Sequence, residues 1–217
     1  MDRSLILSSI MLILMKSESE ASVIPRIDSS CPENVRCPTY IIIREKSTND
    51  YEYRRYDESK WIATRHISAS LTADAETEMH ALLDGYFNRE NTERAIIEQT
   101  QPVVLRVAPN IFPDGRSVFV MFRMIPPAVH GNVPEPTAAS VHIQEVPSFN
   151  VYVRQFSGCL VLPRCQNEVV RLQNDTRNSS LYYQGYFLLA GFESSTRERV
   201  NNEAWLVSTE HVLQDMQ

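Results

Sequence analysis

The sequence predicts an α+β fold in which a distorted antiparallel β-barrel carries two helices packed against its outside. Runs of aromatic and β-branched residues, which favour strands, recur along the chain, and one stretch between them has the period of an amphipathic helix. The order of two strands, a helix and further strands then occurs a second time, with little identity between the halves. A sheet assembled from two such hairpin–helix–strands units is expected to curl into a barrel.

Residues 1–21 have the pattern of a secretory signal peptide. The apolar run at residues 5–15 is too short to cross a bilayer about 30 Å thick. Ser19 and Ala21 supply small residues at the −3 and −1 positions, so cleavage is expected after Ala21. An uncleaved anchor is the alternative, but no later apolar stretch approaches transmembrane length. We therefore predict a secreted, extracellular protein without a stable membrane span.

The four cysteines form two local pairs in the sequence, Cys31 with Cys37 and Cys159 with Cys165. The first pair lies in residues 22–38, which we expect to be an extended N-terminal arm. A zinc knuckle places two residues between its cysteines, whereas five lie between the members of each pair here, so zinc is not favoured. In an oxidising compartment this spacing favours two short-range disulfides, although four cysteines permit three connectivities.

Two N-glycosylation sequons, at Asn174 and Asn178, lie close together in a polar stretch. Behind a signal peptide, such a pair is typical of a surface segment that faces the secretory pathway. We therefore predict a glycoprotein.

The folded domain is expected over residues 39–210, with a C-terminal tail at 211–217. A short strand is expected at residues 40–44. The stretch 51–67 then has two β-rich runs around a polar turn at 57–60, and this pattern predicts a hairpin.

The helical pattern follows this stretch. Thr72 is suited to the N-cap position, and Asp74 and Glu76 in the first turn suit the helix dipole. The predicted apolar stripe of this helix consists of Ala75, Met79, Leu82, Leu83, Tyr86 and Phe87.

Strand patterns resume after the helix. They occur at 95–107, where Pro102 marks an edge, a bulge or a bend, and at 118–125, 182–192 and 204–209. Residues 141–146 and 149–156 predict a second hairpin. A short second helix is predicted from the i, i+4, i+7 spacing of Cys165, Val169 and Leu172.

No catalytic signature is present, since the chain lacks nucleophile-elbow, zinc-protease, phosphate-loop and dinucleotide motifs, and we predict no enzymatic activity. The net charge of −6 and the absence of any basic run argue against a nucleic-acid partner. Among the histidines, His80 follows Met79 at the border of the apolar stripe. It is therefore a candidate metal ligand for haem iron, and a solvated histidine beside a core methionine is the alternative.

Six short motifs occur in order along the chain: Cys37-Pro38-Thr39-Tyr40, Tyr51-Glu-Tyr-Arg-Arg-Tyr56, Lys60-Trp61-Ile-Ala-Thr64, Thr100-x-Pro102-Val103, Val153-Arg-Gln-Phe156-x-Gly158 and Arg199-Val-Asn-Asn-Glu-Ala-Trp205. This ordered set resembles the SOUL / haem-binding protein family, and within it the secreted haem-binding protein 2-like members. The resemblance implies a distorted antiparallel β-barrel with two flanking helices. It also implies non-covalent binding of haem or other porphyrins without catalytic turnover.

Some members of that family have a histidine, considered as an axial ligand, where this chain has Arg55. A guanidinium stays protonated and has no free lone pair, so Arg55 cannot ligate iron but can pair with a haem propionate. We predict that a tetrapyrrole or another flat apolar ligand binds on an apolar patch beside the first helix. The predicted binding residues are Met79, His80, Leu83, Tyr86 and Arg55. The alternative is a module of the same fold that has lost haem binding and binds a lipid or a protein partner.

Overall fold

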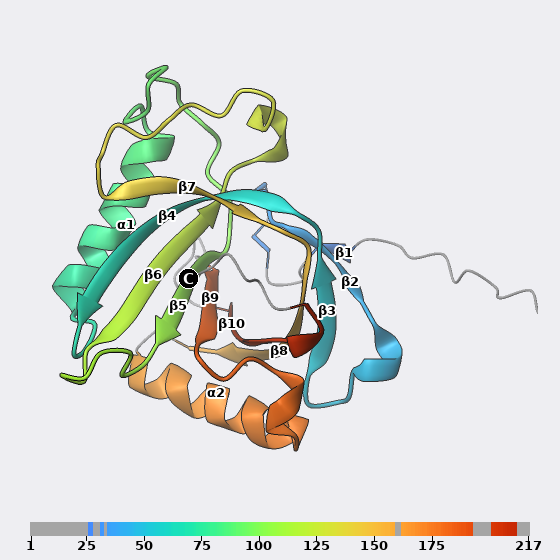
Figure 1. The fold of residues 1–217 in the computed structure, drawn as a ribbon. Coiled ribbons are helices and arrows are strands. Elements are labelled where there is room, and N and C mark those ends of the chain that lie inside the picture. The colour runs from blue at the N-terminus through green and yellow to red at the C-terminus, as the bar shows by residue number, and fades with distance from the viewer. Residues whose placement is uncertain (1–25, 28–30, 33, 159–161, 193–200, 212–217) are drawn as a thin grey trace, which may run out of the picture.

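The computed structural model of the chain describes residues 26–27, 31–32, 34–158, 162–192 and 201–211. In this part of the chain an antiparallel sheet of ten strands curls around a concave apolar interior, and two helices cover its outer face (Figure 1). The predicted α+β class, a distorted β-barrel with two outer helices, is confirmed. The predicted signal peptide at 1–21 lies outside the described residues.

The strands are β1 (Arg26–Ile27), β2 (Thr39–Ile42), β3 (Glu52–Tyr56), β4 (Ser59–Ser68), β5 (Val103–Ala108), β6 (Ser117–Met124), β7 (Val141–Val146), β8 (Phe149–Ser157), β9 (Phe187–Phe192) and β10 (Asn201–Val207). The α-helices are α1 (Ala73–Phe87) and α2 (Leu162–Thr176). Short 3-10 helices are η1 (Arg44–Lys46), η2 (Pro127–Val129), η3 (Ser179–Leu181) and η4 (Thr209–His211). Across the sheet the strands run in the order β1-β2-β3-β8-β10-β9-β5-β6-β4-β7.

The two predicted hairpins are wrong, because their strands follow each other in the chain but do not pair. β3 pairs with β2 and β8, and β4 pairs with β6 and β7. β7 and β8 likewise lie apart in the sheet. A two-residue hairpin turn requires positive φ, which Asn-Gly or Asp-Gly supplies. Neither Asp57-Glu58 nor Pro147-Ser148 contains glycine, and the proline ring fixes φ at a negative value.

The predicted duplication is present in the strand order. The first unit contains strands β3 to β6, and the second contains β7 to β10. When each strand is replaced by its counterpart in the other unit (β3 by β7, β4 by β8, β5 by β9, β6 by β10, and the reverse), the same strand order results, read from the opposite edge of the sheet. The two units meet where β5 pairs with β9, with Leu105 opposite Leu189. The half of the sheet from β3 to β9 contains one strand of the first unit and three of the second, and the half from β5 to β7 contains the reverse, so the two units interlock.

Helix α1 begins where the sequence predicts, because the Thr72 side chain accepts a hydrogen bond from the backbone N–H of Ala75. Its apolar stripe packs against β4 and β6. Helix α2 is longer than predicted, and its predicted stripe of Cys165, Val169 and Leu172 packs against the sheet beside β8 and β10. Within the described ranges, no helix is both long and apolar enough to cross a membrane.

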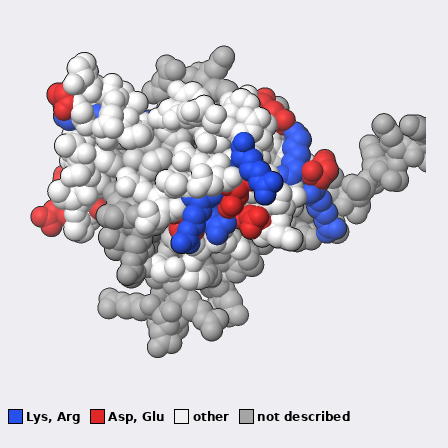
Figure 2. All heavy atoms as spheres, turned by 90° about the horizontal axis from the view of Figure 1, so that it is seen from below, with Lys and Arg blue, Asp and Glu red and all other residues white. Residues whose placement is uncertain are grey.

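Charged side chains of both signs are interspersed on the face of the molecule seen in Figure 2, and large parts of this face carry neither sign. Ion pairs also connect elements of the fold. Arg154 on β8 lies 3.1 Å from a carboxylate oxygen of Glu168 and 2.7 Å from one of Asp175, both on α2. These contacts join the second helix to the strand beneath it.

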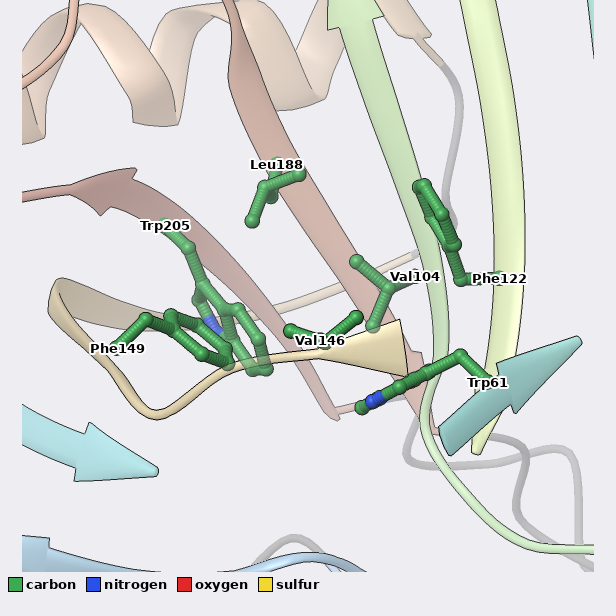
Figure 3. A pocket seen from close by; sticks show the side chains of 7 residues that line it. All are labelled: Trp61, Val104, Phe122, Val146, Phe149, Leu188 and Trp205. Carbon is green, nitrogen blue, oxygen red and sulfur yellow. The ribbon is translucent and has the colours of Figure 1, made fainter. Parts of the chain in front are cut away.

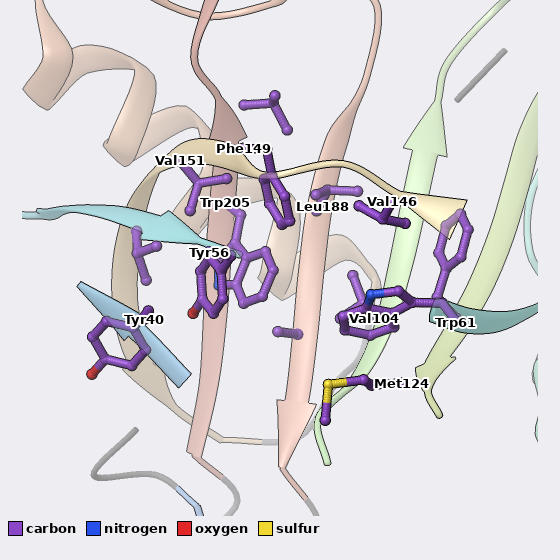
Figure 4. Close-up of a cluster of buried hydrophobic side chains, with 14 of the residues drawn as sticks. Tyr40, Tyr56, Trp61, Val104, Met124, Val146, Phe149, Val151, Leu188 and Trp205 are labelled. Carbon is purple, nitrogen blue, oxygen red and sulfur yellow. The ribbon is translucent and has the colours of Figure 1, made fainter. Parts of the chain in front are cut away.

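Aromatic and aliphatic side chains fill the concave face of the sheet (Figure 4). Alternate residues of the strands point to this face, and on β4, β6, β8 and β10 the residues between them meet the helices. The ring of Tyr56 stacks between two others, with centroids 5.4 Å from Phe149 and 5.1 Å from Trp205. Phe149 and Trp205 of this stack also line an apolar pocket.

Candidate functional site

An apolar pocket lies on the concave face, where the two halves of the sheet meet (Figure 3). Seven neighbouring strands each contribute one lining side chain. In sheet order these are Phe149, Trp205, Leu188, Val104, Phe122, Trp61 and Val146. The cavity is small, with a volume of about 20 Å³, and it opens to solvent. The pocket is thus a narrow aromatic hollow that includes both tryptophans of the chain.

Cross-strand register places charged residues beside this hollow. One row of register partners runs across β10, β9, β5, β6 and β4. In this order it consists of Trp205, Leu188, Arg106, Val120 and Arg65. Residues opposite each other in an antiparallel sheet point to the same face. One row of the concave face therefore carries an indole at one end and two guanidinium groups toward the other.

A buried carboxylate holds the indole of Trp205. Its Nε1–H donates to Oε2 of Glu203 over 2.8 Å. The other oxygen of Glu203 lies 3.0 Å from Nη2 of Arg54, and both side chains are fully buried. Arg54 also donates from Nε to Glu52 over 2.7 Å. This network fixes the orientation of one wall of the pocket.

Arg106 differs from Arg54 because no hydrogen bond or ion pair joins its side chain to any other described residue, and its buried Nε has no partner. Only 8% of the residue is exposed. Its guanidinium carbon lies 5.4 Å from the ring centroid of Tyr186 and 6.0 Å from that of Phe122. Burial lowers the pKa of Arg106, and the charge of Arg65 acts in the same direction. Burial also raises the pKa of Tyr186 to about 12.

The structure places three predicted binding residues in the core. Met79, Leu83 and Tyr86 are buried between α1 and the sheet, so they do not form an open patch. These side chains are buried because the apolar stripe is the face through which the helix packs on β4 and β6. The predicted patch beside the first helix is therefore corrected to a packed interface.

The other two predicted binding residues remain accessible but lie apart. His80 is half-buried on α1, and Arg55 is exposed on β3. Arg55 points to the convex face, because its neighbours Arg54 and Tyr56 point to the concave face. β3 lies between β2 and β8, whereas α1 packs on β4 and β6, so the two residues do not form one site (Figure 1).

The predicted disulfide between Cys31 and Cys37 is present. Cys165 is instead a free, buried thiol, and its predicted partner Cys159 lies outside the described residues. The thiol packs in the core beneath α2 together with Val169 and Leu172. Both sequon asparagines, Asn174 and Asn178, are exposed.

No cluster of three or more His, Cys, Asp or Glu residues that could hold a metal ion occurs in the described part of the chain. The seven lining side chains are aliphatic or aromatic hydrocarbons and indoles, and these groups do not ligate haem iron. The pocket therefore suits an apolar surface and offers no axial ligand from its lining.

No pattern in the sequence assigns Trp61, Trp205 or Arg106 to a site. The two tryptophans stand inside short motifs, but only the register shows that they share a pocket. For Arg106 a signal was available. It is the charged residue within Val103–Ala108, an otherwise apolar strand, and such a residue needs either a partner or a ligand.

Comparison with known proteins agrees with the fold and the motifs. The sequence matches the family described as SOUL heme-binding protein over residues 35–207. It is 29% identical to heme-binding protein 2 of Mus musculus over 160 residues, which cover 72% of this chain and 77% of that protein. It is 23% identical to heme-binding protein 1 of Xenopus laevis over 164 residues, which cover 75% of this chain and 86% of that protein.

A similar fold occurs in the cryo-EM structure of an EcmrR–DNA complex. The TM-score is 0.51 at 9% identity, over 76% of this chain and 60% of that one. At this identity the likeness concerns the fold alone. The family match covers most of the chain, and it shows that this protein belongs to the SOUL heme-binding protein family.

Proposed function

We propose that this protein binds haem or a related tetrapyrrole non-covalently, with the aromatic pocket of the concave face as the site. Its relatives are named heme-binding proteins, which supports the ligand class. The pocket that joins seven strands around Trp61 and Trp205 is the observation that carries the location. Apolar, aromatic-lined hollows are the usual sites for flat organic ligands.

The residues present fit a porphyrin in two respects. Indole and phenyl rings offer stacking surfaces for its macrocycle, and Arg106 at the edge of the pocket offers a cation for its carboxylates. The narrow hollow means that the macrocycle lies against the mouth of the pocket rather than deep inside. Because the lining contains no axial ligand, iron contributes little to affinity, and protoporphyrin binds about as well as haemin.

A titration tests this proposal. Haemin and protoporphyrin are added separately to the folded protein, and the Soret band and tryptophan fluorescence are recorded. We expect a Soret shift with saturable quenching for both ligands, since both tryptophans line the pocket. If the haemin spectrum stayed that of free haemin and fluorescence did not change, tetrapyrrole binding would be excluded and the lipid- or partner-binding alternative favoured.

Two matched variants test the location. Val104→Phe fills the pocket from its floor, whereas Val170→Phe makes the same change at an exposed position on α2. We expect Val104→Phe to weaken tetrapyrrole binding roughly tenfold or more, because added volume in a packed site displaces the ligand or strains the core. Val170→Phe is expected to bind like the wild type. Equal affinity for both variants contradicts the location but not the ligand class.

We also infer that the protein is exported, glycosylated and active outside the cell. The Cys31–Cys37 disulfide supports this inference, since such bonds persist in oxidising compartments. The exposure of Asn174 and Asn178 is compatible with glycans at both positions. Expression in a secreting eukaryotic host, followed by N-terminal sequencing and glycosidase treatment, tests it. We expect a new N-terminus after Ala21 and a mass decrease, and retention of the protein inside the cell contradicts export.

A further inference from the structure

Arg106 is a buried cation without a counter-ion in the described part of the chain. The other buried arginines there have one. Arg54 pairs with Glu203, and Arg123 lies 2.6 Å from a carboxylate oxygen of Asp84. Removing a charge from water is costly unless another charge or hydrogen-bond acceptors replace the lost hydration. Among the described residues, the replacement for Arg106 is limited to two aromatic rings.

The surroundings of Arg106 add positive charge instead of cancelling it. Arg65 and Arg106 are both opposite Val120, from the two sides of β6, so their Cα atoms are two strand spacings, or about 10 Å, apart. Neither residue has an ion pair with a described carboxylate. The charge of Arg65 also contributes to lowering the pKa of His142 on β7, after desolvation. This end of the concave face is thus a cationic region that the fold leaves uncompensated.

The apolar pocket begins directly beside this region. Arg106 is opposite Leu188 in the sheet and two residues from Val104 on the same strand, and both side chains line the pocket. Phe122, whose ring faces the guanidinium, lines it as well. A ligand whose apolar body lies against the mouth of the pocket would therefore bring a terminal anionic group within reach of Arg106.

We propose that the concave face is a binding site for amphipathic carboxylates, with the apolar body against the mouth of the pocket and the carboxylate on Arg106, assisted by Arg65. The guanidinium donates paired hydrogen bonds to a carboxylate, and these bonds are strong in a site shielded from water. The same chemistry occurs in a fatty acid and in the propionates of a tetrapyrrole. This carboxylate site uses the same pocket as the proposed tetrapyrrole site, but it does not depend on tetrapyrrole binding.

The test compares ligands that differ only in the head group. Decanoate, decan-1-ol and decyltrimethylammonium are titrated into the full chain, with tryptophan fluorescence as the readout. For the wild type we expect decanoate to bind roughly tenfold more tightly than decan-1-ol, and the ammonium to bind weakest. Equal affinity for decanoate and decan-1-ol, or no saturable binding of either, overturns the proposal.

Variants then identify the anchor. Arg106→Met keeps a long apolar stem and removes the charge, Arg106→Lys keeps the charge without the paired donors, and Arg171→Met is the control at an exposed position on α2. We expect Arg106→Met to lose the preference for decanoate, Arg106→Lys to retain part of it, and Arg171→Met to retain all of it. Unchanged decanoate affinity in Arg106→Met contradicts the assignment.

Two further measurements separate this proposal from loss of folding and from tetrapyrrole binding. The urea midpoint of Arg106→Met is expected at or above that of the wild type, because an uncompensated buried charge has been removed. Protoporphyrin and its dimethyl ester form the second arm, and the acid alone should depend on Arg106. If decanoate binds through Arg106 while neither porphyrin binds, the proposed function fails and the carboxylate site stands.

Discussion

Arg54 and Arg55 are adjacent in β3 but belong to opposite faces of the sheet. The side chain of Arg54 is fully buried, with Nη2 3.0 Å from Oε1 of Glu203, whereas Arg55 is exposed on the convex face. A strand alternates its side chains with a period of two, so one step along the chain separates a solvated cation from one inside the fold. The charge of Arg54 is therefore neutralised inside the fold by Glu203, in contrast to the charge of Arg106 beside the aromatic pocket.

Glu203→Gln is expected to destabilise the protein by about 3 kcal/mol, because Arg54 then keeps Glu52 as a partner but loses its buried one. Urea unfolding followed by circular dichroism measures the change. The matched control is Glu145→Gln, whose carboxylate is 77% exposed beside Lys60 and should contribute little. Equal unfolding midpoints for the two variants contradict the expected role of Glu203.

Helix α1 is expected to stabilise the fold without binding the ligand. Leu83 is fully buried, so Leu83→Ala should lower the free energy of unfolding by roughly 2–5 kcal/mol, whereas half-buried His80→Ala should change it little. The Soret spectrum of a tetrapyrrole complex is expected to be the same for wild type and both folded variants. A changed spectrum in His80→Ala would show axial ligation by this residue.

Asp84 is expected to anchor α1 to the sheet through Arg123, whose side chain is almost completely buried. Asp84→Ala leaves that guanidinium without its carboxylate and should cost about 1–3 kcal/mol of unfolding free energy. Asp114→Ala removes a similar contact to Arg116 at an exposed turn, so a much smaller loss is expected there. Chemical denaturation of the two variants side by side checks the difference.

The sequence predicts the elements of this fold better than it predicts their pairing. The cap at Thr72 and the stripe of α1 depend on neighbours three or four residues away, and these local patterns are correct. The pairing of β3 with β8 joins residues about a hundred positions apart, and no local pattern specifies such a partner. The aromatic pocket shares this limitation, because register alone brings Trp61 and Trp205 to one face.

The binding residues show the same limitation at the level of single side chains. Periodicity correctly marks Leu83 and Tyr86 as apolar, but an apolar stripe indicates burial and does not tell whether a ligand or a sheet covers it. The resemblance to the family points to Arg55, but the pleat of β3 places its side chain on the exposed convex face. The sequence marks Arg106 as a charge inside an apolar strand, but only the three-dimensional structure shows that its buried Nε has no hydrogen-bond partner.

The Cys165 thiol is expected to be unreactive in the folded protein. Burial raises its pKa to about 11, and the charge of Glu76 adds to this effect, so almost no thiolate is present at neutral pH. Iodoacetamide labelling, read by mass spectrometry of the peptide that contains Cys165, should be slow in buffer and fast in urea.

Because an unfolded thiol ionises near pH 9 and the folded one near pH 11, the unfolded state loses its proton first. The contribution of this thiol to stability is therefore fully present below about pH 9 and decreases as the pH rises toward 11. Cys165→Ser should remove this part of the alkaline loss, and rapid labelling of the native protein would contradict the buried, protonated thiol.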